Sequence, residues 1–155
     1  MQDAQEPISQ IKDLEEKMRK TRGIALLIEE TIRRLYDDKH PKSLHQVQWS
    51  VLRYLSRAGE QTRNQAGLAK FLGITSGPAS RTAKALEQRA LIESVPNPTD
   101  SRSKIYSLTD QGRQELDGDP IDKAAQILAD YTDEELMLLA RILDDMSTKL
   151  GQPSR

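Results

Sequence analysis

Apolar residues recur at the three- and four-residue spacing of helices over the first forty positions. Ile11, Leu14 and Met18 stand among many charges, which predicts a weakly amphipathic helix from Ile8 onward. Gly23 is expected to interrupt this helix, and a second helix is expected over Ile24–Tyr36. The polar run Asp37–Pro41 then ends it, and the first seven residues are expected to be frayed.

The middle of the chain predicts two short helices joined by a tight turn. Ser43 and Gln46 have the spacing of a capping box, and the helix that they open should run to about Arg57, with Gly59 as its C-cap. Its expected inward residues are Val47, Val51, Tyr54 and Leu55. Thr62 and Gln65 repeat that spacing before a short helix stopped by Gly73. Two residues later Thr75 can cap the next helix, with Pro78 in its first turn, so this is a helix-turn-helix pattern.

After Leu91 the pattern changes to short alternating or β-branched segments. Leu91–Val95 and Lys104–Leu108 predict a β-hairpin whose turn-rich tip is 96–103. A hairpin directly after the second helix makes a winged helix-turn-helix. Helices are expected again after the caps Thr109 and Thr132, with a kink or a restart at 118–120. The final helix carries an apolar stripe of Leu136, Leu139, Ile142 and Leu143. The predicted fold class is mainly α with a small β-wing.

Composition removes several classes of function. The 155 residues suit one domain, and they include no Cys and only two His, so disulfides, thiol chemistry and a His-rich metal site are not expected. The longest apolar runs are Ile24–Ile28 and Leu136–Ala140, which are too short to cross a bilayer. No secretory signal opens the sequence, and a cytoplasmic protein without a cofactor or a membrane partner is expected.

Charge is distributed unevenly along the chain. Residues 41–113 hold 11 basic and 5 acidic side chains, whereas 114–155 hold 4 basic and 10 acidic. The net charge of −1 therefore conceals a cationic middle, next to an acidic C-terminal part. A cationic segment suits a polyanion, because each neutralised phosphate releases counterions. Chance clustering on a solvated surface is the alternative.

The second helix of the helix-turn-helix has the most informative pattern. Ala79, Ala83 and Leu86 share one face, and the opposite face carries Gly77, Ser80, Arg81, Lys84 and Gln88. The apolar face can pack closely, and the polar face fits the major groove of DNA. Arg81 could bind a guanine, Ser76 and Ser80 could touch bases or phosphates, and Lys84 is better placed for a phosphate. An ordinary solvated helix is the alternative.

The predicted wing tip carries Asp100-Ser101-Arg102. An acid two residues before an arginine can hold the guanidinium in one orientation, and an ordered arginine suits the narrow minor groove. A turn aspartate beside a solvated arginine is the alternative.

Together these features resemble the MarR family of winged-helix transcriptional regulators. The stretches that carry the resemblance are Gln48–Leu55, Gly67–Ile74, Ala79–Glu87, Arg89–Ile92, Asp100–Arg102 and Ser107–Gly112. The resemblance implies a homodimer joined through its terminal helices and a palindromic operator in double-stranded DNA. It implies three parts: dimerisation helices in 1–40, the DNA-binding domain in 41–113, and further dimerisation helices in 114–155.

The resemblance also implies roles for individual residues. Thr75, Ser76, Gly77, Ser80, Arg81 and Lys84 would serve the major groove, Asp100, Ser101 and Arg102 the minor groove, and Asn64 and Gln65 phosphates. Two departures from the family pattern are visible. Ala90 replaces a common glycine, which predicts a less sharp turn into the wing, and Ser101 replaces a frequent arginine. Glu93 adds a negative charge, so weaker wing contacts are expected.

Members of this family often bind a small aromatic acid, a phenol or a related thioester. The residues of this chain that would line such a site are Tyr36, His45, Trp49 and Arg53. Trp49 could instead be a core aromatic, and His45 could simply be exposed. The terminal apolar stripes independently favour a dimer, because one small domain would struggle to bury both.

Other classes of function have less support. An enzyme is not expected, since no nucleotide-binding, zincin or nucleophile-elbow motif is present. A metal-responsive regulator lacks ligands. A winged-helix module that binds a protein and senses no ligand is the main alternative, because the fold does not determine function.

Overall fold

The computed structural model describes residues 5–37, 43–98 and 100–151. The chain divides into two compact units, 1–46 and 47–155. The first unit contains α1 (Gln5–Leu35), a continuous helix of 31 residues. The predicted interruption at Gly23 is wrong: a glycine inside a helix costs only about 1 kcal/mol, and the flanking residues form helix readily. The polar run Asp37–Pro41, which was predicted to end the helix, lies mostly outside the described residues, since 38–42 are not among them.

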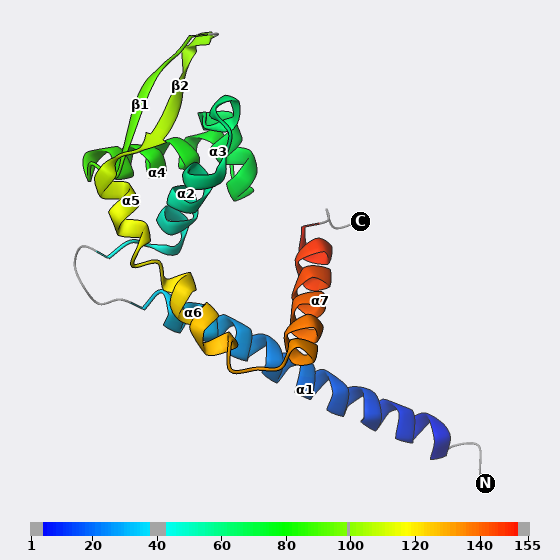
Figure 1. The fold of residues 1–155 in the computed structure, drawn as a ribbon. Coiled ribbons are helices and arrows are strands. Elements are labelled where there is room, and N and C mark those ends of the chain that lie inside the picture. Colours follow the sequence, from blue (N-terminus) through cyan, green and yellow to red (C-terminus); the bar gives the residue numbers. More distant parts are fainter. Residues whose placement is uncertain (1–4, 38–42, 99, 152–155) are drawn as a thin grey trace. The chain divides into compact units, whose positions relative to one another are not determined.

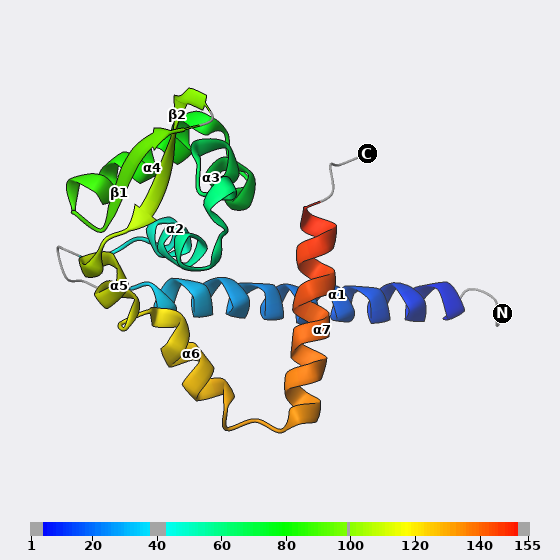
Figure 2. The ribbon, with the colours of Figure 1, turned by 45° about the horizontal axis from the view of Figure 1, so that its top comes forward.

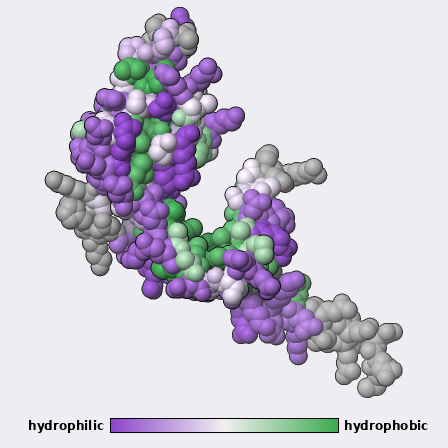
Figure 3. Space-filling view, in the orientation of Figure 1, coloured by the Kyte–Doolittle hydropathy of each residue, from purple (hydrophilic) through white to green (hydrophobic). Residues whose placement is uncertain are grey.

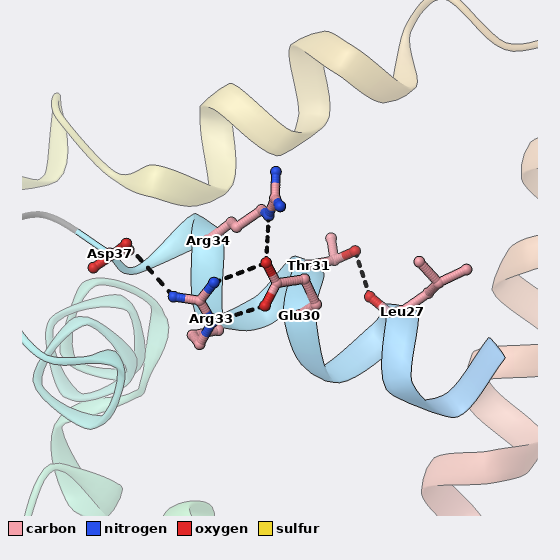
Figure 4. A network of polar contacts seen from close by, with 6 residues as sticks. All are labelled: Leu27, Glu30, Thr31, Arg33, Arg34 and Asp37. Carbon is pink, nitrogen blue, oxygen red and sulfur yellow. Dashed lines mark hydrogen bonds and ion pairs between the residues drawn. The ribbon is translucent and has the colours of Figure 1, made fainter. Parts of the chain in front are cut away.

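The end of α1 carries a cluster of local ion pairs (Figure 4). Glu30 accepts hydrogen bonds from Arg33 Nε at 2.7 Å and from Arg34 Nε at 2.6 Å. These hydrogen bonds, that of Arg33 first, lower the pKa of Glu30 from 4.5 to about 2. Arg33 also faces Asp37, with Nη1 3.6 Å from its carboxylate. Cations in the last turn of a helix complement its dipole, so the cluster stabilises this end.

The second unit begins with the winged helix-turn-helix (Figures 1 and 2). Its helices are α2 (Gln46–Arg57), a 3-10 turn (Glu60–Thr62), α3 (Gln65–Leu72) and α4 (Ser76–Gln88). The strands β1 (Ile92–Asn97) and β2 (Asp100–Leu108) form an antiparallel hairpin with Ile92 opposite Leu108. Three further helices follow, α5 (Asp110–Leu116), α6 (Pro120–Leu128) and α7 (Asp133–Leu150). The predicted fold class, mainly α with a small β-wing, is confirmed.

The core of this unit lies between α2, α3, α4 and the hairpin. Its largest fully buried side chains are Leu52, Leu68, Leu86, Leu91 and Val51. Of the inward residues predicted for α2, Val51 and Leu55 are buried, whereas Val47 is exposed and Tyr54 half-buried. Trp49 and Leu52 are buried in addition. The buried face of α2 is therefore turned around the helix axis relative to the predicted one, towards Trp49 and Leu52.

The helix ends follow local chemistry, with two differences from the expectation. Gly73 ends α3 with φ of +63°, Thr109 caps α5, and Thr132 and Glu135 form a capping box on α7, as predicted. The cap of α3 is Asn64, whose Oδ1 accepts from the Gly67 N–H at 2.9 Å, and Thr62 lies in the preceding 3-10 turn. Gly59 has an extended conformation and is no left-handed C-cap.

Helices α6 and α7 leave apolar side chains exposed within the single chain. Of the four residues expected to be buried on α7, Leu139, Ile142 and Leu143 are about two-fifths exposed and Leu136 is half-buried. Green, hydrophobic surface over these helices is visible in Figure 3. On α1, Leu14, Met18, Ile24 and Leu27 are exposed as well. The described part of the chain contains no helix long and apolar enough to span a membrane.

Candidate nucleic-acid interface

Helix α4 has one buried and one exposed face, as its sequence predicts. Ala79, Ala83 and Leu86 are at most 1% exposed. Small side chains on this face let α4 approach α3, which it contacts directly. The opposite face is available to a partner, because Gly77, Arg81, Lys84 and Gln88 are exposed and Ser80 is half-buried.

The side chain of Arg81 lies along its own helix. Its Nη1 is 3.8 Å from the point that a Cβ at Gly77 would occupy, one helical turn earlier. Helical side chains lean towards the N-terminus, so the guanidinium covers the first turn of α4. Gly77 leaves the space beside it open. Arg81 and Ser76 therefore present their donors at the end of α4 that enters a groove in helix-turn-helix proteins.

The start of α4 is fixed by its neighbour α3. The Gln65 side-chain amide donates to the Ser76 carbonyl oxygen at 3.2 Å. Thr75 occupies the N-cap position with extended backbone but makes no side-chain capping bond. Gly73 supplies the sharp reversal between the two helices. Gln65 thus has a structural contact that its motif alone did not reveal.

The 3-10 turn packs closely against α2 and α3. The Tyr54 hydroxyl donates to the Thr62 carbonyl oxygen at 2.6 Å, and the ring stacks on Phe71 with centroids 4.7 Å apart. A Cβ at Gly67 would lie 2.0 Å from that same carbonyl oxygen. Asn64 uses Oδ1 for the cap and Nδ2 for the Gln61 carbonyl. Both polar ends of the Asn64 side chain are therefore engaged within the chain.

The wing is held to the end of α4 by a small polar cluster. Ser94 on β1 donates to Glu87 Oε1 at 2.5 Å. Tyr106 on β2 is 4% exposed, and burial, followed by the nearby Glu87 carboxylate, raises the pKa of its hydroxyl. The predicted blunting of the turn into the wing is wrong, because Ala90 adopts a left-handed φ of +56°. The turn is closed by a hydrogen bond from the Ala90 N–H to the Glu87 carbonyl oxygen.

At the wing tip, Asp100 acts on the backbone of Arg102. Its Oδ1 accepts from the backbone N–H of Arg102 at 3.0 Å. The sequence had suggested a contact with the guanidinium of Arg102 instead. Arg102 and Lys104 are exposed on β2, and Ser101 lies between Asp100 and Arg102 in that strand. Thr99 lies outside the described residues. The carboxylate sets the turn from which Arg102 projects.

The four residues predicted for an effector differ in their surroundings. Trp49 is 7% exposed on α2, His45 is exposed and Tyr36, just after α1, is half-buried. Arg53 is engaged with Asp119: Nε is 2.7 Å from Oδ2 and Nη2 is 3.2 Å from Oδ1. Sequence reasoning missed this partner, because 66 residues separate the two and only the N-cap role of Asp119 has a local signal.

These elements define a winged helix-turn-helix protein. Helix α4 packs through a face of small residues, the left-handed Gly73 joins it to α3, and the β1–β2 hairpin follows as the wing. Residues 43–103 match the model of the MarR family. A curated relative, the uncharacterized HTH-type transcriptional regulator YdgJ of Bacillus subtilis, is 30% identical over 91 residues, which are 57% of this chain and 56% of YdgJ. The match thus spans little more than half of that relative's length.

Two solved structures share the fold. The DNA complex of S. aureus MepR superimposes with a TM-score of 0.70 at 23% identity, covering 83% of this chain and 96% of MepR. PcaV of Streptomyces coelicolor, solved with its natural ligand, gives 0.65 at 19% identity, covering 81% and 89%. This chain is therefore similar to the MarR family over residues 43–103, and it shares the winged-helix fold of these two structures.

Proposed function

We propose that this protein is a homodimeric repressor that binds a palindromic operator in double-stranded DNA in the cytoplasm. The observation that carries the proposal is the division of α4, whose inner face is closed by Ala79, Ala83 and Leu86 while Arg81 and Lys84 stay exposed. Exposed donors on a rigidly packed helix can reach base edges in the major groove. The cationic middle of the chain, net +6 over 41–113, supplies attraction to phosphates.

Roles for individual residues follow from their places. Residues at the start and outer face of α4 would serve the major groove: Thr75, Ser76, Gly77, Ser80, Arg81 and Lys84. Arg102, projecting from a turn that Asp100 shapes and Ser101 continues, would enter the minor groove. Asn64 and Gln65 would lie near phosphates at the start of α3. MepR, which has the same fold, was solved bound to DNA.

The dimer is supported by the apolar surface that the single chain leaves exposed. Leu139, Ile142 and Leu143 on α7 and Ile127 on α6 are each about two-fifths exposed or more. Apolar stripes of this kind mark association surfaces. A two-fold dimer would hold two copies of α4 about 34 Å apart, one turn of DNA.

Salt dependence of duplex binding tests the proposal. A dimer that neutralises several phosphates should lose affinity steeply with salt, with a log–log slope of about −0.9 per phosphate. A winged helix that binds only protein would show no such slope. Sequencing the DNA that co-purifies with the protein in cells would identify the operator.

We also propose that a small aromatic acid, phenol or related thioester releases the protein from DNA. Tyr36, His45, Trp49 and Arg53 are the candidate residues, and PcaV provides a precedent for ligand binding on this fold. The effector would favour a dimer whose two copies of α4 no longer match the half-sites. Titrating benzoate, the simplest acid of this class, into the protein–operator complex tests it, and undiminished binding at saturating benzoate contradicts the acid version.

A further inference from the structure

Arg53 and Asp119 join two parts of the second unit that are far apart in sequence. Arg53 lies in the middle of α2, beside the fully buried Leu52, and Asp119 lies between α5 and α6. The guanidinium forms a two-pronged contact, with Nε 2.7 Å and Nη2 3.2 Å from the two carboxylate oxygens. The side chains are only 20% and 9% exposed. Such a planar, partly buried pair fixes orientation as well as distance.

The same carboxylate begins the next helix. Asp119 Oδ1 accepts from the Ile121 N–H at 2.9 Å, and Pro120 is the first residue of α6. An N-cap oxygen has a fixed position relative to the first turn of its helix. Because Asp119 is held by Arg53 at the same time, the first turn of α6 is tied to α2 in the core of the winged module.

We propose that Arg53 and Asp119 are positioning residues that set the spacing at which the dimer reads its two half-sites. The proposal rests on the proposed function, since it requires a dimer on DNA. The segment after Asp119 carries the exposed apolar faces of α6 and α7, through which the copies would associate, whereas α4 packs on the winged module. The direction in which α6 leaves Asp119 therefore determines how α4 is placed relative to the association faces of α6 and α7.

A small change in the direction of α6 at Asp119 produces a large displacement at the far end of the helix. Helix α6 has 9 residues and is therefore about 13 Å long. A tilt of roughly 15° about its first turn would move its far end by about 3.5 Å, close to the rise of one base pair, about 3.4 Å. On this proposal, holding that first turn against such a tilt matters on the scale of one base pair between half-sites.

The test uses a series of duplexes built on the operator that the wild-type protein selects, with the separation of the half-sites changed by one base pair in either direction. Asp119→Asn retains an oxygen for the cap and removes the charge, and Arg53→Lys retains the charge and removes the fork. Asp110→Asn is the matched control, because the Asp110–Arg113 pair is exposed and local, with a 3.6 Å separation. Affinities, melting temperature and mass in solution are measured for each.

The wild-type protein and the Asp110→Asn control are expected to prefer the native spacing by roughly tenfold, the scale of one mismatched base pair. Asp119→Asn and Arg53→Lys should reduce this preference to about threefold or less while remaining dimers. The inference is wrong if both variants keep the full preference, or if they only melt earlier and bind every spacing more weakly by one factor. If one variant does not fold, the other decides. A wild-type protein that ignores duplex DNA would instead overturn the proposed function.

Discussion

At the scale of single residues, the turn between α4 and the wing places an alanine in a conformation that glycine adopts more easily. Ala90 has φ of +56°, and its carbonyl oxygen accepts from the Thr109 hydroxyl at 2.7 Å, so the conformation is held from both sides of the hairpin. An L-residue in the left-handed region costs roughly 1 kcal/mol or more. The wing therefore keeps its sharp entry at a cost in free energy.

Ala90→Gly is expected to raise the free energy of unfolding by about 1 kcal/mol, because glycine adopts positive φ without the Cβ clash. Urea denaturation followed by circular dichroism measures it. Ala85→Gly, inside α4, is the control and should lower stability by about 1 kcal/mol. Loss of stability in Ala90→Gly would show that the left-handed turn carries no strain.

At Gly112, the backbone of Leu91 comes too close for any side chain larger than hydrogen. A Cβ at Gly112 would lie 1.9 Å from the Leu91 carbonyl oxygen, which also accepts from the Thr109 N–H. Gly112→Ala is expected to destabilise the protein by about 2 kcal/mol or more, since backbone must shift. Gly118→Ala, where the nearest contact is an ordinary 3.6 Å, should change stability by less than about 1 kcal/mol. Equal melting temperatures for the two variants would contradict this account.

At the scale of elements, features with local signals were predictable from the sequence and non-local ones were not. Gly73, Thr109 and the Thr132–Glu135 box end or begin helices through bonds within four residues. Thr62 was mistaken for the cap of α3 because its spacing to Gln65 imitates a capping box, while tertiary packing draws it into the 3-10 turn. The Arg53–Asp119 pair has no local pattern, since it depends on how α2 meets the end of α5.

The exposed face of α4 and the wing are expected to contribute differently to DNA binding. Arg81→Ala should remove the preference at the base position that Arg81 contacts, a loss of roughly 1–3 kcal/mol, because a base contact carries sequence information. Arg102→Ala should weaken binding to all duplexes more evenly. Gel shifts on matched and mismatched operators measure both. Unchanged discrimination by Arg81→Ala, or loss confined to one base for Arg102→Ala, would reverse the assignments.

At the scale of the whole molecule, charge and apolar surface are divided along the chain. The basic excess lies in 41–113, with the outer face of α4 and the wing. The acidic excess lies in 114–155, where α6 and α7 expose apolar side chains. An acidic surface beside an association face disfavours DNA there. The division favours one part for binding phosphates and another for joining the two copies.

Breaking the apolar face of α7 should therefore separate folding from assembly. Leu143→Asp is expected to give a folded monomer, since Leu143 is 41% exposed within the chain and contributes little to its own core. Operator affinity should fall on the order of 100-fold or more, because two linked half-site contacts become one. Light scattering after gel filtration gives the mass, and Asp144→Ala on the polar face is the control. A dimeric Leu143→Asp would place the interface elsewhere, and a monomer with full affinity would mean that the two copies do not read DNA together.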